Sequence, residues 1–136
     1  MSTQQRNDAC VIAVDPSIAA TLRRQTLVVL EANHHYYEEL LEYGPDAQHA
    51  LSVIYRDAFA VLDAIGWHPN PDQGTVDVPL TTGHLEQLRR RRYDLMRTNL
   101  DRLPPLGQPM PAEIDTNRTA AHHLAALIAR AENPER

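Results

Sequence analysis

The chain has 136 residues, a formal net charge of −5 and 43% hydrophobic residues. This length fits one domain that can bury a core without a disulfide or a structural metal. The acidic balance argues against nucleic acid or an anionic membrane surface as a partner, and no segment reaches the roughly 20 apolar residues of a membrane-spanning helix. All 13 basic residues are arginine, which excludes a Schiff-base lysine and a phosphate-binding lysine.

The N-terminal segment carries few signals of regular structure. Its cysteine, Cys10, is the only one in the chain and cannot form an internal disulfide. Residues 1–8 are polar, and the apolar run at 9–14 is too short for a signal peptide, so we expect a cytoplasmic protein. We expect residues 1–14 to form a partly flexible tail and residues 15–133 to form a single domain.

Proline and glycine divide the first half of that domain into two helices. Asp15 is a favourable N-cap residue, and Pro16 suits the first helical position after it. The periodic apolar pattern predicts a first helix over 15–43 and a second over 46–65. Each of these segments is followed by a glycine, which favours the end of a helix.

The second half of the domain begins with a loop over residues 67–80. Residues 75–80 could form an extended piece, but one strand cannot form a sheet alone. A third helix is predicted over 81–103, where two prolines stop it, and a fourth over 111–133. The chain is therefore predicted to be all-α: a four-helix bundle with an up-down-up-down course and a long loop between its second and third helices.

The segment EANHHYYEELLEY, residues 31–43, raises the question of a metal site. Its Glu-x-x-His spacing occurs in di-iron helical bundles, whose ligands point into the bundle from all four helices. A helical projection places this segment's acidic side chains on the outer side of the first helix, and no second Glu-x-x-His occurs in the chain. We therefore expect a solvated face and no metal cofactor. The alternative metal ligands are Glu31, His34, His35 and Glu38.

A second apolar seam runs along the first helix beside its core face. Its members recur at 3-4-3-4 spacing and are Leu27, Leu30, His34, Tyr37 and Leu41. Because a helix in a monomeric bundle needs only one wide stripe, the second seam predicts a homodimer interface. Packing of this seam under residues 9–14 is the alternative. A histidine within the interface would make association sensitive to pH.

The run RRRR at 89–92 resembles a nucleic-acid patch only in composition. Four successive residues spread around most of a helix and cannot form one stripe. Glu86 and Arg90, like Arg97 and Asp101, stand four residues apart and suit surface ion pairs. We therefore expect no nucleic-acid partner.

Several polar side chains fall on faces that the helical pattern assigns to the core. The apolar face of the third helix holds Leu85, Leu88, Met96 and Leu103, with Leu95 and Leu100 at its edges. Arg92 and Asn99 fall in the middle of this face. Asn33 lies on the core face of the first helix, while Asn117 and Glu113 lie on or near that of the fourth. In an up-down-up-down bundle these groups fall in one half of the molecule, which makes them candidate ligand-binding residues.

Three interpretations of Arg92 follow, because a lone buried guanidinium is costly. It can belong to a buried network with Glu113, in which the asparagines satisfy one another. It can bind an anionic or carbonyl-bearing ligand in a pocket between helices. It can also reach the surface along its aliphatic stem.

No catalytic motif is present in the chain. It lacks Gly-x-Ser-x-Gly, a phosphate-binding loop and a Cys/His pair. His84 projects near the apolar face of the third helix and is expected to be a hydrogen-bonded packing residue. We expect a homodimeric binding protein that acts on a protein partner or on a small polar or anionic ligand held between helices. The alternative is a metal protein or enzyme that uses histidines of the first helix and of the 67–84 region, such as His68.

Overall fold

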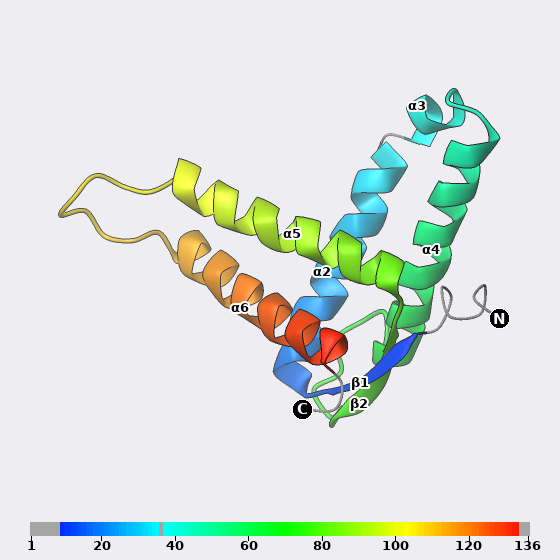
Figure 1. The fold of residues 1–136 in the computed structure, drawn as a ribbon. Coiled ribbons are helices and arrows are strands. Elements are labelled where there is room, and N and C mark those ends of the chain that lie inside the picture. Colours follow the sequence, from blue (N-terminus) through cyan, green and yellow to red (C-terminus); the bar gives the residue numbers. More distant parts are fainter. Residues whose placement is uncertain (1–8, 36, 134–136) are drawn as a thin grey trace.

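A computed structural model describes residues 9–35 and 37–133 of the chain. This part is mostly helical, as predicted, but it also contains a small sheet (Figure 1). In chain order the elements are β1 (Cys10–Val14), α2 (Pro16–His35), α3 (Tyr37–Leu41), α4 (Pro45–Ile65), β2 (Val76–Leu80), α5 (Thr82–Asp101) and α6 (Ala112–Glu132).

The sheet was not predicted. β1 pairs with β2 in antiparallel register, with Ile12 opposite Val78. Alternate side chains of both strands are buried, including Val14 and Leu80, because one face of the sheet covers the core. The expectation of no strand pair is wrong, since the partner of the 75–80 segment lies more than 60 residues earlier in the chain. Of the expected tail, residues 10–14 form β1, and residues 1–8 lie outside the described residues.

The helix ends follow the punctuation of the sequence closely. The Asp15 side chain accepts a hydrogen bond of 2.9 Å from the backbone N–H of Ile18, as its N-cap role predicts. The first predicted helix is two helices in the structure, α2 and the short α3, and Tyr36 between them lies outside the described residues. The next helix, α4, starts at Pro45 after Gly44, which adopts a φ of 96°.

The four long helices form two hairpins rather than one bundle in which all four axes are roughly aligned. Figure 1 shows α2 beside α4 and α5 beside α6, with the two pairs pointing in different directions from a shared base. The base is the region where the sheet and one end of each long helix meet. An up-down-up-down four-helix bundle is therefore not confirmed. No helix in the described ranges is both long and apolar enough to cross a membrane.

The core fills this base. Large side chains from four helices and both strands are fully buried there; they include Leu22, Leu62, Val78, Leu80, Leu88, Leu124 and Leu127. Arg23 of α2 is also buried, and its guanidinium donates to the backbone oxygens of Gly66 (2.8 Å) and Ile65 (3.1 Å) at the end of α4. This arginine satisfies carbonyls that a helix end leaves unpaired, and it joins α2 to α4.

Candidate functional site

The outer half of the α5–α6 hairpin exposes apolar side chains that the sequence pattern assigns to a core. Met96 is 47% exposed, Leu100 69%, Leu103 54% and Met110 51%. Near the base of the same hairpin, by contrast, Leu88 is fully buried. The pattern on α5 is continuous, but α2 and α4 turn away from its outer half (Figure 1). The predicted core face therefore continues as a surface.

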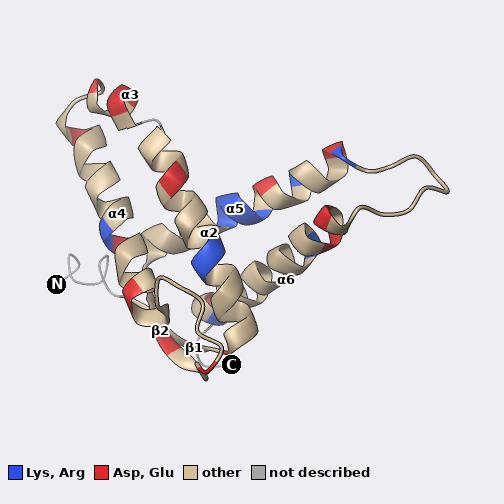
Figure 2. Cartoon of the chain, turned by 180° about the vertical axis from the view of Figure 1, so that it is seen from behind, with Lys and Arg blue, Asp and Glu red and all other residues tan. Residues whose placement is uncertain are grey.

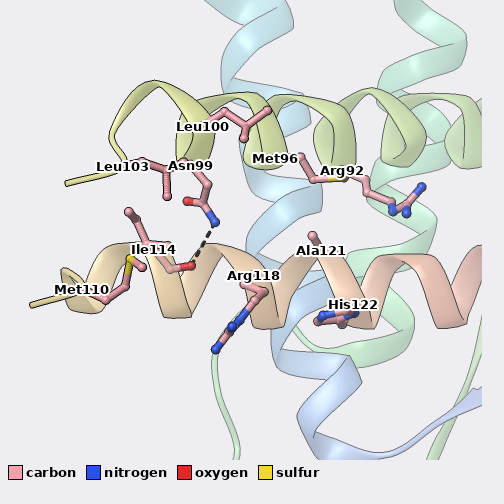
Figure 3. A pocket seen from close by; sticks show the side chains of 10 residues that line it. All are labelled: Arg92, Met96, Asn99, Leu100, Leu103, Met110, Ile114, Arg118, Ala121 and His122. Atoms are coloured by element: carbon pink, nitrogen blue, oxygen red, sulfur yellow. Dashed lines mark hydrogen bonds between the residues drawn. The ribbon is translucent and has the colours of Figure 1, made fainter. Parts of the chain in front are cut away.

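These side chains border a cavity of about 380 Å³, which we call the α5–α6 groove. It is lined by Arg92, Met96, Asn99, Leu100, Leu103, Met110, Ile114, Arg118, Ala121 and His122 (Figure 3). Ile114 and Ala121 of α6 are buried and form its floor. Arg92 and His122 lie toward one end, and Leu103 and Met110 lie toward the other (Figure 3). Arg118 lies between them on α6, and its guanidinium points away from α5. The groove is thus apolar along its length, with one arginine, Arg92, at the end nearer the base.

The polar groups at the groove floor are already hydrogen-bonded. Asn99 donates to the backbone oxygen of Ile114 at 3.0 Å (Figure 3). Its side-chain oxygen accepts a hydrogen bond of 3.1 Å from the amide of Asn117. The predicted proximity of these two asparagines is correct. Both amides join α5 to α6, so their first role is to hold the hairpin together.

Arg92 does not point into a core. Its side chain is exposed at the edge of the groove, which fits the interpretation that it reaches the surface and not that of a buried network. The predicted Arg92–Glu113 pair is wrong, because the exposed Glu113 forms an ion pair with Arg102 instead. Asn33 lies apart from this group on α2, where its amide donates to the backbone oxygen of Val29 at 2.7 Å. The structure therefore brings Arg92, Asn99 and Asn117 onto one hairpin without Asn33.

Of the other arginines in the 89–92 run, Arg89 and Arg91 are held by neighbouring side chains, whereas Arg90 is exposed and forms no ion pair with a described residue. Arg89 forms ion pairs with Glu86 and Glu132, and Arg91 contacts Asp94 (3.3 Å) and Gln25 (2.9 Å). The expected Glu86–Arg90 pair does not form, because Arg89 takes that carboxylate. Among the described residues, no ion pair involves Arg92. Its charge remains available at the groove.

The predicted dimer seam is only partly a surface. Leu27, His34 and Tyr37 are exposed, and the rings of His34 and Tyr37 stack at a centroid distance of 6.3 Å. Leu30 and Leu41 are half-buried, and Leu30 packs against the core. The seam is divided between α2 and α3 rather than following one helix. Its role as an interface stays a prediction.

A metal site does not form from the alternative ligands. Within residues 9–35 and 37–133, no three histidine, cysteine or carboxylate side chains come close enough together to hold an ion. Glu31, His34, His35 and Glu38 are all exposed. Their segment of helix presents them to solvent, as the projection indicates.

A buried polar cluster lies at the base, where α5 begins. His84 is 1% exposed, and its Nε2 is 3.1 Å from the Thr26 hydroxyl. Burial lowers the pKa of His84 to about 4, although the nearby Asp57 carboxylate acts in the opposite direction. Thr81 caps α5 by accepting from the backbone N–H of His84, and it donates to Asp57 at 2.7 Å. His84 is the hydrogen-bonded packing residue that the sequence predicts.

This cluster combines a hydroxyl, an imidazole and a carboxylate, but it is closed to substrates. Thr26 and His84 are almost completely buried, and Asp57 is only 5% exposed. A catalytic base must reach the proton that it removes from a substrate. The cluster therefore stabilises the junction of α2, α4 and α5. Thr26 and Asp57 could not be predicted as members of this cluster, because neither departs from an ordinary helical pattern.

The features above define a helical protein with an apolar groove that is edged by arginine. Comparisons with protein-family models, with curated proteins and with solved structures find no match to this chain. The argument for its function therefore starts from the groove.

Proposed function

We propose that this chain is a binding protein and that the α5–α6 groove is its binding site. The observation that carries this proposal is the exposure of four large apolar side chains, Met96, Leu100, Leu103 and Met110, around a buried floor. Contiguous apolar surface on a soluble protein marks interaction sites. Methionines on such a surface adapt to the shape of a partner.

The lining residues favour a protein partner over a small ligand. All of them belong to α5, to α6 or to the loop just before α6, so the groove has two walls and a floor. A site for a small molecule usually buries 70–90% of its ligand. A helix or helical hairpin placed along the groove would instead complete a bundle of the kind that the sequence pattern predicts.

The charges at the groove indicate what such a partner carries. Arg92 and Arg118 both line the groove, and the Arg118 guanidinium is shared with the exposed Asp115 at 2.8 Å. Guanidinium groups pair well with carboxylates. The expected partner therefore presents apolar side chains next to carboxylates. Homodimerisation, which the seam on α2 and α3 predicts, is one form that this binding can take.

Binding fits the groove better than catalysis. Its amide, Asn99, is committed to hydrogen bonds within the hairpin. His122 is the one lining residue that could act as a base, and no nucleophile lines the groove beside it. Nucleophilic catalysis needs a base within hydrogen-bond reach of its nucleophile. No specific observation favours the alternative of a metal protein.

The test uses 8-anilinonaphthalene-1-sulfonate, a fluorescent probe that combines apolar rings with one negative charge. We expect dilute folded protein to enhance its fluorescence, because such probes bind exposed apolar surface. Leu100→Glu should weaken probe binding by about tenfold, since it places a carboxylate beside the sulfonate. Tyr93→Ser is the matched control, because Tyr93 is an exposed apolar residue of α5 outside the groove.

Circular dichroism checks that each variant keeps its helices. Equal probe binding by wild type, Leu100→Glu and Tyr93→Ser would show that the groove is not the binding surface. Loss of probe binding in Tyr93→Ser alone would contradict the proposal in the same way.

A further inference from the structure

An acidic surface lies at the end of the other hairpin, far from the groove. We call residues 31–35 and 37–46 the acidic tip; they are the end of α2, all of α3 and the turn into α4. The tip contains no lysine or arginine. Its five carboxylates are all exposed: Glu31, Glu38, Glu39, Glu42 and Asp46. Figure 2 shows them as red segments at the α3 end of the molecule.

None of these carboxylates has a cationic partner among the described residues. The six ion pairs within those residues lie elsewhere, on α4, α5 and α6. Five like charges close together repel one another, and this repulsion is relieved when a cationic surface approaches. The tip therefore carries unbalanced negative charge.

The acidic tip is also partly apolar. Tyr43 in the turn after α3 is 76% exposed and Tyr37 on α3 is also exposed, while Leu40 and Leu41 are half-buried. Tyrosines bring large apolar area to an interface at a low cost in conformational entropy. The tip thus presents apolar side chains next to carboxylates, which is the chemistry expected of a partner for the α5–α6 groove.

The groove carries the opposite charge. Residues 89–102 contain six arginines, of which Arg89, Arg91 and Arg102 are held in ion pairs. Arg92 at the groove edge takes part in no ion pair with a described residue. In Figure 2 the blue segments of α5 stand apart from the red tip. The two unbalanced surfaces are complementary in both charge and apolar character.

We infer that the occupant of the α5–α6 groove is the acidic tip of a second copy of this chain. This inference rests on the proposed function of the groove and names its partner. Both figures place α3 at the end of one hairpin and the outer part of α5–α6 at the end of the other, so a chain cannot fill its own groove in this fold.

A two-fold axis makes the contact reciprocal. The tip of each copy lies in the groove of its partner, so a closed dimer contains two equivalent contacts. Two contacts double the buried surface, which helps a small tip reach the roughly 1,000 Å² that a specific interface needs. This dimer differs from one formed by the α2–α3 seam. In a seam dimer the same surface of both copies would meet at the two-fold axis, whereas here the tip of one copy meets the groove of the other.

Charge exchange tests the inference by sedimentation equilibrium. One double variant, Arg92→Glu with Arg118→Glu, makes the groove acidic. The other, Glu38→Arg with Glu42→Arg, makes the tip basic. All four positions are exposed, so the fold should persist, and circular dichroism verifies this. We expect wild type to dimerise and each double variant alone to associate at least about tenfold more weakly, because like charges then meet in both contacts.

A one-to-one mixture of the two double variants should restore the dimer. In the mixed pair the acidic groove meets the basic tip, and the native groove meets the native tip, so both contacts are again complementary. Arg24→Glu is the control, because it reverses an exposed arginine outside the groove and should leave the dimer unchanged. Raising the salt from about 0.05 M to about 0.5 M should weaken the wild-type dimer, since the Debye length falls.

Three results of these experiments would contradict the inference. A wild-type chain that stays monomeric overturns the inference, and it leaves the proposed function standing if the groove still binds the fluorescent probe. A dimer that survives both charge reversals overturns it as well and moves the interface to another surface. Dissociation of each variant without recovery in the mixture also contradicts the reciprocal contact.

Discussion

Leu88 and Leu100 lie on the same helix, twelve residues apart, and their surroundings are opposite. Leu88 is fully buried where α5 meets the other helices and the sheet, whereas Leu100 is 69% exposed on the outer hairpin. Helix propensity and residue type are the same at both positions. The difference is set by which elements cross α5, because only the base of the molecule has enough neighbours to form a core.

The comparison shows that apolar periodicity predicts which face of a helix will be buried against another surface. It does not predict which element or partner supplies that surface. At the base, that covering comes from within the chain. On the outer hairpin of α5 and α6, the same pattern is left without an intramolecular neighbour, and we assign its covering to a partner.

The largest expected effect separates these two regions directly. Leu88→Ala should lower the free energy of unfolding by about 2–5 kcal/mol, because it leaves a cavity in a packed core. Leu100→Ala should change it by less than about 0.5 kcal/mol in dilute protein, since the side chain is exposed. Urea denaturation at low protein concentration measures both. Equal costs at the two positions would mean that the outer hairpin is packed as tightly as the base.

A second difference concerns pH and the buried histidine at the base. Burial lowers the folded-state pKa of His84 to about 4, below the 6.5 of an unperturbed imidazole. Between these values the unfolded chain binds a proton that the folded chain does not. Stability is therefore lost as the pH falls from about 7 toward 4, by on the order of 2–3 kcal/mol from this group.

Denaturation of wild type and His84→Gln at several pH values between about 7 and 5 tests this linkage. The variant should show a flatter dependence on pH, because it has no imidazole to protonate at this position. His49→Gln is the control, since His49 is exposed on α4 and should leave the slope of wild type intact. An unchanged slope in His84→Gln would contradict the buried, neutral state of His84.

A smaller effect is expected at the buried arginine. Arg23→Met should cost about 2 kcal/mol, because the carbonyls of Ile65 and Gly66 lose a charged donor at the end of α4. The adjacent Arg24 is exposed, so Arg24→Met should lie within about 0.5 kcal/mol of wild type. Thermal unfolding of the two variants side by side provides the measurement. A tolerated Arg23→Met would show that this arginine does not hold α2 to α4.

Much of the secondary structure follows from local chemistry. Asp15 and Thr81 cap helices because their side chains accept from backbone N–H groups in the next turn. Gly66 ends α4 with a φ of 89°, a backbone conformation that residues other than glycine rarely adopt. These signals lie within a few residues of the structures that they determine.

Long-range pairing could not be predicted in the same way. The strand at 10–14 meets its partner at 76–80 only after three helices have folded between them, and neither segment is long enough to indicate a sheet alone. The environments of Arg23 and Arg92 depend on long-range arrangement in the same way. The first lies beside the carbonyl end of another helix, and the second lies where the two hairpins have separated.

The sequence predicted several residues of the candidate site, but it did not predict that they line an exposed groove. Met96, Leu103, Arg92 and Asn99 were all placed on one face of the third helix, and that face does contain the groove. Its exposure depends on the angle between two hairpins, which the apolar pattern of a single helix does not encode. The sequence pattern predicts Asn99 and Asn117 in the same half of the molecule, and the structure pairs them because α5 and α6 are adjacent helices of one hairpin.

The most direct test of the account is the change in backbone amide NMR shifts when the protein is diluted. If the groove holds the tip of a second copy, dilution should shift amides of two separate regions together, residues 37–46 and residues 92–122. Amides at the base, including those around Leu22 and Leu124, should stay unchanged. Shifts along α2 at Leu27 and Leu30 with none in the groove would contradict the account and favour the seam as the interface.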